Sequence, residues 1–161
     1  MVDISQFDPQ SFLDASTTEA ATRRPPLPVD NPASPDTLYT GVIQEPKMRT
    51  WQGKKDPSQS GLAIDIPILI DVPGQLQDQL KLPAQIQLTA GGFVDLTAQG
   101  LMDWSPGKNS TLRRYREATG LNVAGQTFSP RMLQGKVVKV KITHELYNGD
   151  IMDKIGNVLK A

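Results

Sequence analysis

The sequence predicts a mainly β fold with many turns and a single helix. Thirteen prolines and thirteen glycines, against four Phe, three Tyr and two Trp among 161 residues, favour short strands joined by turns over a helical bundle. From Leu62 to Val72 apolar residues recur at every second position, which is the pattern of a strand with one buried face. Only the stretch after residue 109 combines a helical apolar stripe with a start and a stop signal.

Residues 1–38 are predicted to form a flexible, acidic, Pro-rich N-terminal arm. Five prolines between Pro25 and Pro35 forbid a regular helix there and favour an extended linker. The arm holds six acids and two bases, so residues 39–161 carry a net charge of +4 although the whole chain is neutral. The alternative is a docked arm, in which Phe12 and Leu13 anchor it on its own body or on a neighbouring subunit.

The domain predicted over residues 39–161 opens with two strands joined by a polar loop. The first strand should run from about Tyr39 to Trp51 with a bulge at Pro46, and the second is the alternating segment from Leu62 to Val72. Residues 73–83 read as a loop or a short amphipathic turn. A hairpin around Gly91 and Gly92 should follow.

The helix is predicted over residues 110–119. Asn109 or Ser110 can cap its N-terminus, and Gly120 can end it. The stripe expected to face the core is Leu112, Tyr115, and Ala118 or Thr119.

Two further strands should close the domain as a hairpin at Asn148-Gly149. Alternation assigns the inner side of the fourth strand to Val138, Val140, Ile142, His144 and Leu146. The order is therefore three strands, a helix and two strands. A five-stranded barrel of the oligonucleotide/oligosaccharide-binding (OB) type, with one helix between strands three and four, has this order, and other small β-barrels and sandwiches are compatible with it.

Cations and aromatic residues suggest an anionic ligand with exposed rings. Four cations and an indole gather in nine residues of the first strand and its loop, where charge can attract phosphates and a ring can stack on bases. The alternative is an ordinary solvated hairpin. The candidate contacts with DNA are Lys47, Arg49, Trp51, Lys54 and Lys55, then Lys139 and Lys141 on the fourth strand, and secondarily Trp104, Lys108 and Arg113.

The remaining aromatic residues and the single histidine are assigned to structural roles. Trp104 is either a second stacking platform or a residue packed under the helix. Tyr39 and Phe93 are assigned to the core or to an interface. One His makes no metal site, and we interpret His144 as a satisfied core residue.

An enzyme is not predicted, and neither is a cofactor. Without cysteine there is no thiolate nucleophile or thiolate metal site, and no G-x-S-x-G or phosphate-binding glycine motif occurs. No apolar run approaches the roughly 18 residues that a membrane helix needs. The first residues lack the pattern of a secretory signal.

Four stretches resemble a group of bacteriophage single-stranded-DNA-binding proteins with an OB core. They are F-D-P-Q-S-F-L-D-A-S with T-R-R-P-P-L-P-V, then L-Y-T-G-V-I, then G-L-M-D-W-S-P-G-K-N-S-T-L-R-R-Y-R-E-A-T-G-L-N, and finally M-L-Q-G-K-V-V-K-V-K-I-T-H-E with its Y-N-G-D turn. The resemblance implies a protein that coats exposed strands in the host cytoplasm, beside phage replication or recombination proteins. Several such proteins carry a C-terminal acidic tail, whereas the acidic segment here is N-terminal.

The function expected from the sequence is therefore non-enzymatic, sequence-tolerant binding and protection of single-stranded DNA during phage replication or recombination. The partners expected are single-stranded DNA and phage replication or recombination proteins, with no membrane; a homo-oligomer stays open. The alternative is a virion structural or assembly protein whose N-terminal arm contacts neighbouring subunits.

Overall fold

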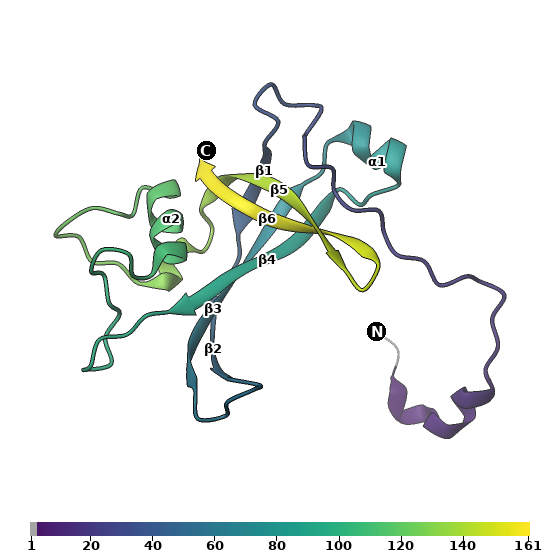
Figure 1. Ribbon diagram of the computed structural model, residues 1–161. Coiled ribbons are helices and arrows are strands. Elements are labelled where there is room, and N and C mark those ends of the chain that lie inside the picture. The colour runs from purple at the N-terminus through teal and green to yellow at the C-terminus, as the bar shows by residue number, and fades with distance from the viewer. Residues whose placement is uncertain (1–2) are drawn as a thin grey trace.

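The computed structural model describes residues 3–161 and shows a mainly β protein with one antiparallel sheet of six strands (Figure 1). The strands are β1 (Tyr39–Ile43), β2 (Lys47–Gln52), β3 (Ser60–Asp71), β4 (Gln85–Val94), β5 (Val137–Tyr147) and β6 (Asp150–Lys160). The helices are α1 (Gly74–Leu80) and α2 (Ser110–Ala118), with the 3-10 turns η1 (Ile4–Gln6), η2 (Pro9–Asp14) and η3 (Pro130–Leu133).

Strand β3 holds the sheet together. Strands β1 and β2 pair with the two ends of one of its edges, and β4 pairs with the other edge from Leu62 to Asp71. Strand β1 also pairs with β5, and β5 pairs with β6, so the β5–β6 hairpin continues the sheet beyond β1. The alternation predicted for this strand is confirmed, because its inward residues Ile64, Ile66, Ile68 and Ile70 are fully buried.

The predicted count of five strands is wrong, because the first strand is divided in two. Ile43 lies opposite Ile68, and Lys47 lies opposite Asp65. The chain therefore advances four residues from Ile43 to Lys47 while β3 advances three, which leaves one extra residue before β2. This is the expected bulge around Pro46. A proline has no N–H to give to the ladder, and here the interruption separates β1 from β2.

A closed barrel is likewise not what the ladders show. Within residues 3–161, β4 and β6 are not joined by strand pairing, and the sheet stays open between them. Helix α2 contacts both strands at this opening (Figure 1). Gly92 is one cause of the close approach, since a Cβ atom there would lie 2.8 Å from Oγ1 of Thr111 in α2.

Helix α2 matches its predicted position and its predicted buried stripe, which is Leu112, Tyr115 and Ala118. Its start differs in detail. Asn109 makes no side-chain bond to the helix and instead ties the helix to the end of β4. Its side-chain amide donates to the backbone oxygens of Asp95 and Asp103 at 2.9 Å, and its Oδ1 accepts from the Asp95 N–H at 2.9 Å.

The inner side predicted for the fourth strand is correct through Ile142 and wrong for His144 and Leu146. Both residues are exposed, Leu146 to 71%. Strand β1 begins opposite Val140, so the far part of the β5–β6 hairpin extends past the sheet, and beyond Ile142 it is contacted by the segment around Arg24 and Leu27. His144 Nε2 nevertheless donates to the carbonyl oxygen of Leu27 at 2.8 Å.

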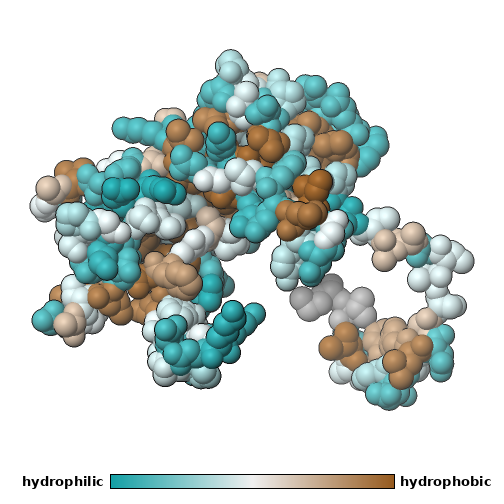
Figure 2. Space-filling view, in the orientation of Figure 1, coloured by the Kyte–Doolittle hydropathy of each residue, from teal (hydrophilic) through white to brown (hydrophobic). Residues whose placement is uncertain are grey.

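The second half of the predicted arm is packed onto the body. Leu27 is fully buried within the main core, and the Tyr39 hydroxyl donates to the carbonyl oxygen of Pro28 at 2.7 Å. A boundary at residue 38 therefore does not separate packed from unpacked chain. Residues 3–22 run away from the body in Figure 1, and Figure 2 shows apolar surface on their helical turns.

A buried carboxylate on β6 holds this segment in place. Asp153 accepts two bonds from the Arg24 guanidinium, at 2.6 and 3.0 Å, and one from the Leu27 N–H at 2.7 Å. Burial alone would raise the pKa of Asp153, but these bonds and the charge of Arg24 hold that pKa below its ordinary value.

Replacing Asp153 with Asn should lower the free energy of unfolding by about 1–3 kcal/mol at neutral pH, toward the lower end because Arg24 stays partly solvated. The folded pKa lies below the unfolded value, so the carboxylate stabilises the fold above about pH 4 and this contribution fades as pH falls through the folded pKa. Urea unfolding of both proteins at pH 7 and pH 3 measures the gap. A gap that stays constant would contradict this account.

Candidate functional site

Two aromatic side chains form a platform on the outer face of β2, β3 and β4. The rings of Trp51 and Phe93, called here the aromatic platform, have centroids 5.1 Å apart at an angle of 58°. Trp51 lies opposite Gly61 and Phe93 opposite Ala63. A Cβ atom at Gly61 would lie 2.8 Å from the indole Nε1, so the indole rests on the bare backbone of β3. Phe93 is 69% exposed.

Cations lie beside Trp51 on β2 and in the loop that follows this strand. Lys47 and Arg49 alternate with Trp51 along β2 and therefore share its face, whereas Lys54 and Lys55 extend the exposed loop that follows. Arg49 Nε donates to Asp65 Oδ2 at 2.9 Å, so one of the four charges is partly offset. The face consequently combines an exposed phenyl ring and a half-buried indole with surplus positive charge, which suits a polyanion carrying flat rings.

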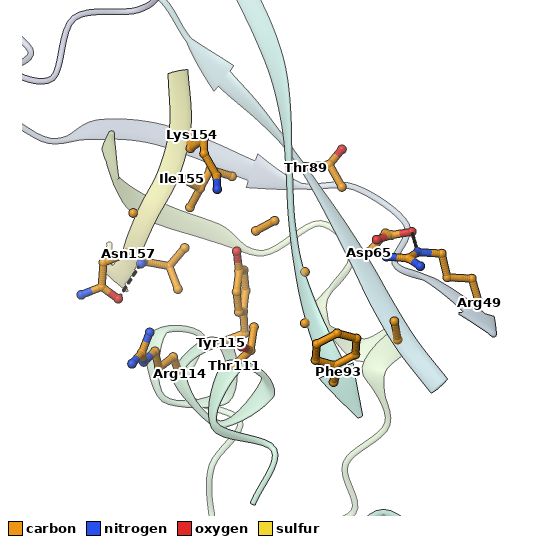
Figure 3. Close-up of a pocket in the computed structure, with 16 residues that line it drawn as sticks. Arg49, Asp65, Thr89, Phe93, Thr111, Arg114, Tyr115, Lys154, Ile155 and Asn157 are labelled. Atoms are coloured by element: carbon orange, nitrogen blue, oxygen red, sulfur yellow. Dashed lines mark hydrogen bonds and ion pairs between the residues drawn. The ribbon is translucent and has the colours of Figure 1, made fainter. Parts of the chain in front are cut away.

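A cleft of about 460 Å³ continues from Phe93 toward the open side of the sheet (Figure 3). Its walls come from the unpaired edge of β4, from α2 and from β6. The side chains labelled in Figure 3 are Arg49, Asp65, Thr89, Phe93, Thr111, Arg114, Tyr115, Lys154, Ile155 and Asn157. The cleft and the aromatic platform share Phe93, so a ligand on one can reach the other.

Tyr115 projects from α2 into the space between β4 and β6, with its hydroxyl directed away from the helix (Figure 3). The residue is 3% exposed, and its hydroxyl has no hydrogen-bond partner among residues 3–161. An orphaned buried hydroxyl costs about 1–3 kcal/mol. Burial also raises the pKa of Tyr115 well above its usual value, so the group is a neutral O–H donor at physiological pH.

The structure divides the other predicted contacts between two places. Trp104 is 41% exposed, but the Arg116 guanidinium already lies 4.6 Å from its ring centroid and Phe128 packs against its edge. It belongs to a local cluster beside α2. Lys108 is exposed in the preceding loop, and Arg113 lies 3.9 Å from Glu117 on the helix surface.

Lys139 and Lys141 lie on the outer side of β5, opposite Leu159 and Asn157 of β6. Strands β3 and β1 separate β5 from β2 in the sheet order, so the ladder does not bring these lysines beside Trp51. The cations of β2 and its loop and the two lysines of β5 are thus two separate groups.

Sequence reasoning missed Phe93, Arg114 and Tyr115 as members of a site. For Phe93 alternation offered a signal: once Val94 is placed inward, as in the structure, its neighbour points outward. The core alternative for Phe93 is wrong because the side chain is 69% exposed, and the interface alternative stays a prediction. The sequence carries no signal for the unpaired hydroxyl of Tyr115, because the surroundings of this group depend on how α2 packs against β4 and β6.

No protein-family model and no curated protein sequence matches this chain. Among residues 3–161 no three His, Asp or Glu side chains gather as they would around a metal ion. No helix in the described part of the chain has the length and apolar character to cross a membrane.

Replacing Trp51 with Ala should leave the protein folded. The indole packs on the outer face against Phe93 and outside the core, so we expect a loss of about 1–2 kcal/mol in the free energy of unfolding. Leu112→Ala in the core is the comparison, with an expected loss of about 2–5 kcal/mol. Urea unfolding followed by circular dichroism measures both; an unfolded Trp51→Ala protein would make Trp51 a core residue.

Proposed function

We propose that this protein binds single-stranded DNA without catalysis and with little sequence preference. The observation that carries the proposal is the aromatic platform, in which Phe93 is exposed and Trp51 is half-buried, together with the exposed lysines Lys47 on β2 and Lys54 and Lys55 in the next loop. Exposed rings stack on bases of any sequence, and the lysines attract the phosphates between them. A duplex hides its bases, so such a surface favours a single strand.

The order of the strands supports the same proposal. When β1 and β2 are taken as one bent strand, the chain follows the connections of an OB fold, with α2 between the third and fourth strands. OB domains bind oligonucleotides on the face of their second and third strands and at the loop joining the first two. In this chain that face carries Phe93, and that loop carries Lys54 and Lys55.

The biological setting of the proposal comes from the resemblance to phage single-stranded-DNA-binding proteins. In that setting the protein coats and protects strands exposed in the host cytoplasm during replication or recombination, beside the proteins that carry out those processes. Neutral overall charge is compatible with this role, because the excess of bases lies in residues 39–161.

The N-terminal turns favour one alternative, a structural or assembly protein. Ile4, Phe7, Phe12 and Leu13 are exposed, and the rings of Phe7 and Phe12 meet edge to face at 5.6 Å. An apolar group at the end of an extended segment suits docking onto a neighbouring subunit. Failure of DNA to bind would leave this alternative in place.

Fluorescence anisotropy with labelled oligo-dT and a random duplex, at two salt concentrations, tests the proposal. We expect oligo-dT to bind more tightly than duplex, with a slope of log K against log salt of roughly −3 if about four phosphates are neutralised. Trp51→Ala should cost roughly 1–3 kcal/mol of binding, whereas Phe12→Ala on the arm should not. No affinity for oligo-dT at low salt would refute the proposal, and equal affinity for duplex would reduce it to general polyanion binding.

Replacing Asp65 with Asn should strengthen the binding of oligo-dT. The substitution removes a negative charge from the binding face and releases Arg49 from its ion pair. We expect a gain of about two- to fivefold at low salt, since an exposed ion pair is worth up to about 1 kcal/mol. Asp78→Asn on α1, away from this face, is the matched control. Unchanged affinity in Asp65→Asn would exclude Arg49 as a contact.

A further inference from the structure

The cleft between β4, α2 and β6 is suited to a small flat group. Its volume of about 460 Å³ lies within the usual range of small-ligand pockets. One wall is the segment Ala90–Gly91–Gly92, which presents almost no side chain. In the described part of the chain, β4 pairs with β3 alone, so alternate N–H and C=O groups on its other edge face the cleft without a strand partner. A planar ring with hydrogen-bonding edges can therefore approach the backbone closely.

The buried hydroxyl of Tyr115 beside the cleft has no acceptor among residues 3–161. A phenylalanine would fill the same place in the core without leaving a buried donor unpaired. Buried polar groups in native proteins nearly always have a partner. Tyr115 lines the cleft and its hydroxyl points between the two strands (Figure 3), so a ligand seated against it can provide the missing acceptor.

Charge at the cleft favours an anionic group next to that ring. Arg114 lines the cleft, is exposed, and has no ion pair among residues 3–161. Lys154 lines the same cleft and is paired with Glu145 at 2.7 Å. Arg113, one residue before Arg114, belongs to the helix surface near Glu117 and does not line this cleft.

We propose that the cleft receives one nucleobase turned out of a bound single strand. The Tyr115 hydroxyl donates a hydrogen bond to an acceptor on the base edge, and Arg114 contacts a neighbouring phosphate. Phe93 belongs to both the aromatic platform and the cleft, so it marks where the strand passes from one to the other. Unstacked bases are commonly recognised through their edges in this way. The inference rests on the proposed function.

The test uses the full-length protein, its Tyr115→Phe variant, a labelled dT oligonucleotide and an abasic sugar-phosphate strand of equal length. Because only an unpaired hydroxyl is removed, Tyr115→Phe should unfold at the same temperature as the original protein or higher. Its affinity for oligo-dT should fall by about 3- to 10-fold, the effect of one hydrogen bond. Its affinity for the abasic strand should equal that of the original protein, because that strand has no base to accept a hydrogen bond from the Tyr115 hydroxyl.

A second pair of variants covers the case in which Tyr115→Phe does not fold. Arg114→Gln should weaken oligo-dT binding about twofold or more beyond the effect of Arg113→Gln, its neighbour outside the cleft. Equal losses in these two variants, or unchanged oligo-dT binding by folded Tyr115→Phe, would overturn the inference while leaving the platform in place. An equal loss on abasic and dT strands would also overturn it. If the original protein does not bind oligo-dT at all, the proposed function fails first.

Discussion

The alternation along β3 is the constraint on which the rest of the structure depends. Its inward isoleucines build the core, and two of its outward positions, Gly61 and Ala63, are small. Those small residues leave room for the indole of Trp51 and the ring of Phe93 from the strands on either side. A large side chain at Gly61 would occupy the place of the indole. One strand thus forms the core on one face and the floor of the candidate site on the other.

The buried carboxylate of Asp153 has a comparable double effect on β6. On one side it fixes Arg24 and Leu27, so part of a proline-rich segment completes the core. The next residue, Lys154, lines the cleft across from β4. Among residues 3–161, β6 pairs with β5 alone, and the hairpin of these two strands extends beyond β1. The contact with the arm therefore supports a strand that the sheet holds on one edge.

The features predicted well from the sequence are those with strong local periodicity. The inward face of β3 and the buried stripe of α2 follow directly from spacing. The features that were missed depend on distant partners. Division of the first strand at Pro46 follows from its register against β3, and burial of Leu27 depends on Asp153, 126 residues away. Alternation along β5 places His144 on the inward side, but only the tertiary structure shows that this part of the hairpin extends past the sheet and leaves His144 exposed.

The central claim is that a single strand lies across the platform of β2, β3 and β4. Titration of the ¹⁵N-labelled full-length protein with oligo-dT, followed by two-dimensional NMR, tests it most directly. The account predicts that the indole N–H of Trp51 and the amides of Gly92 and Phe93 shift most. Shifts confined to the outer face of β5 around Lys139 and Lys141, with the Trp51 indole unmoved, would contradict it.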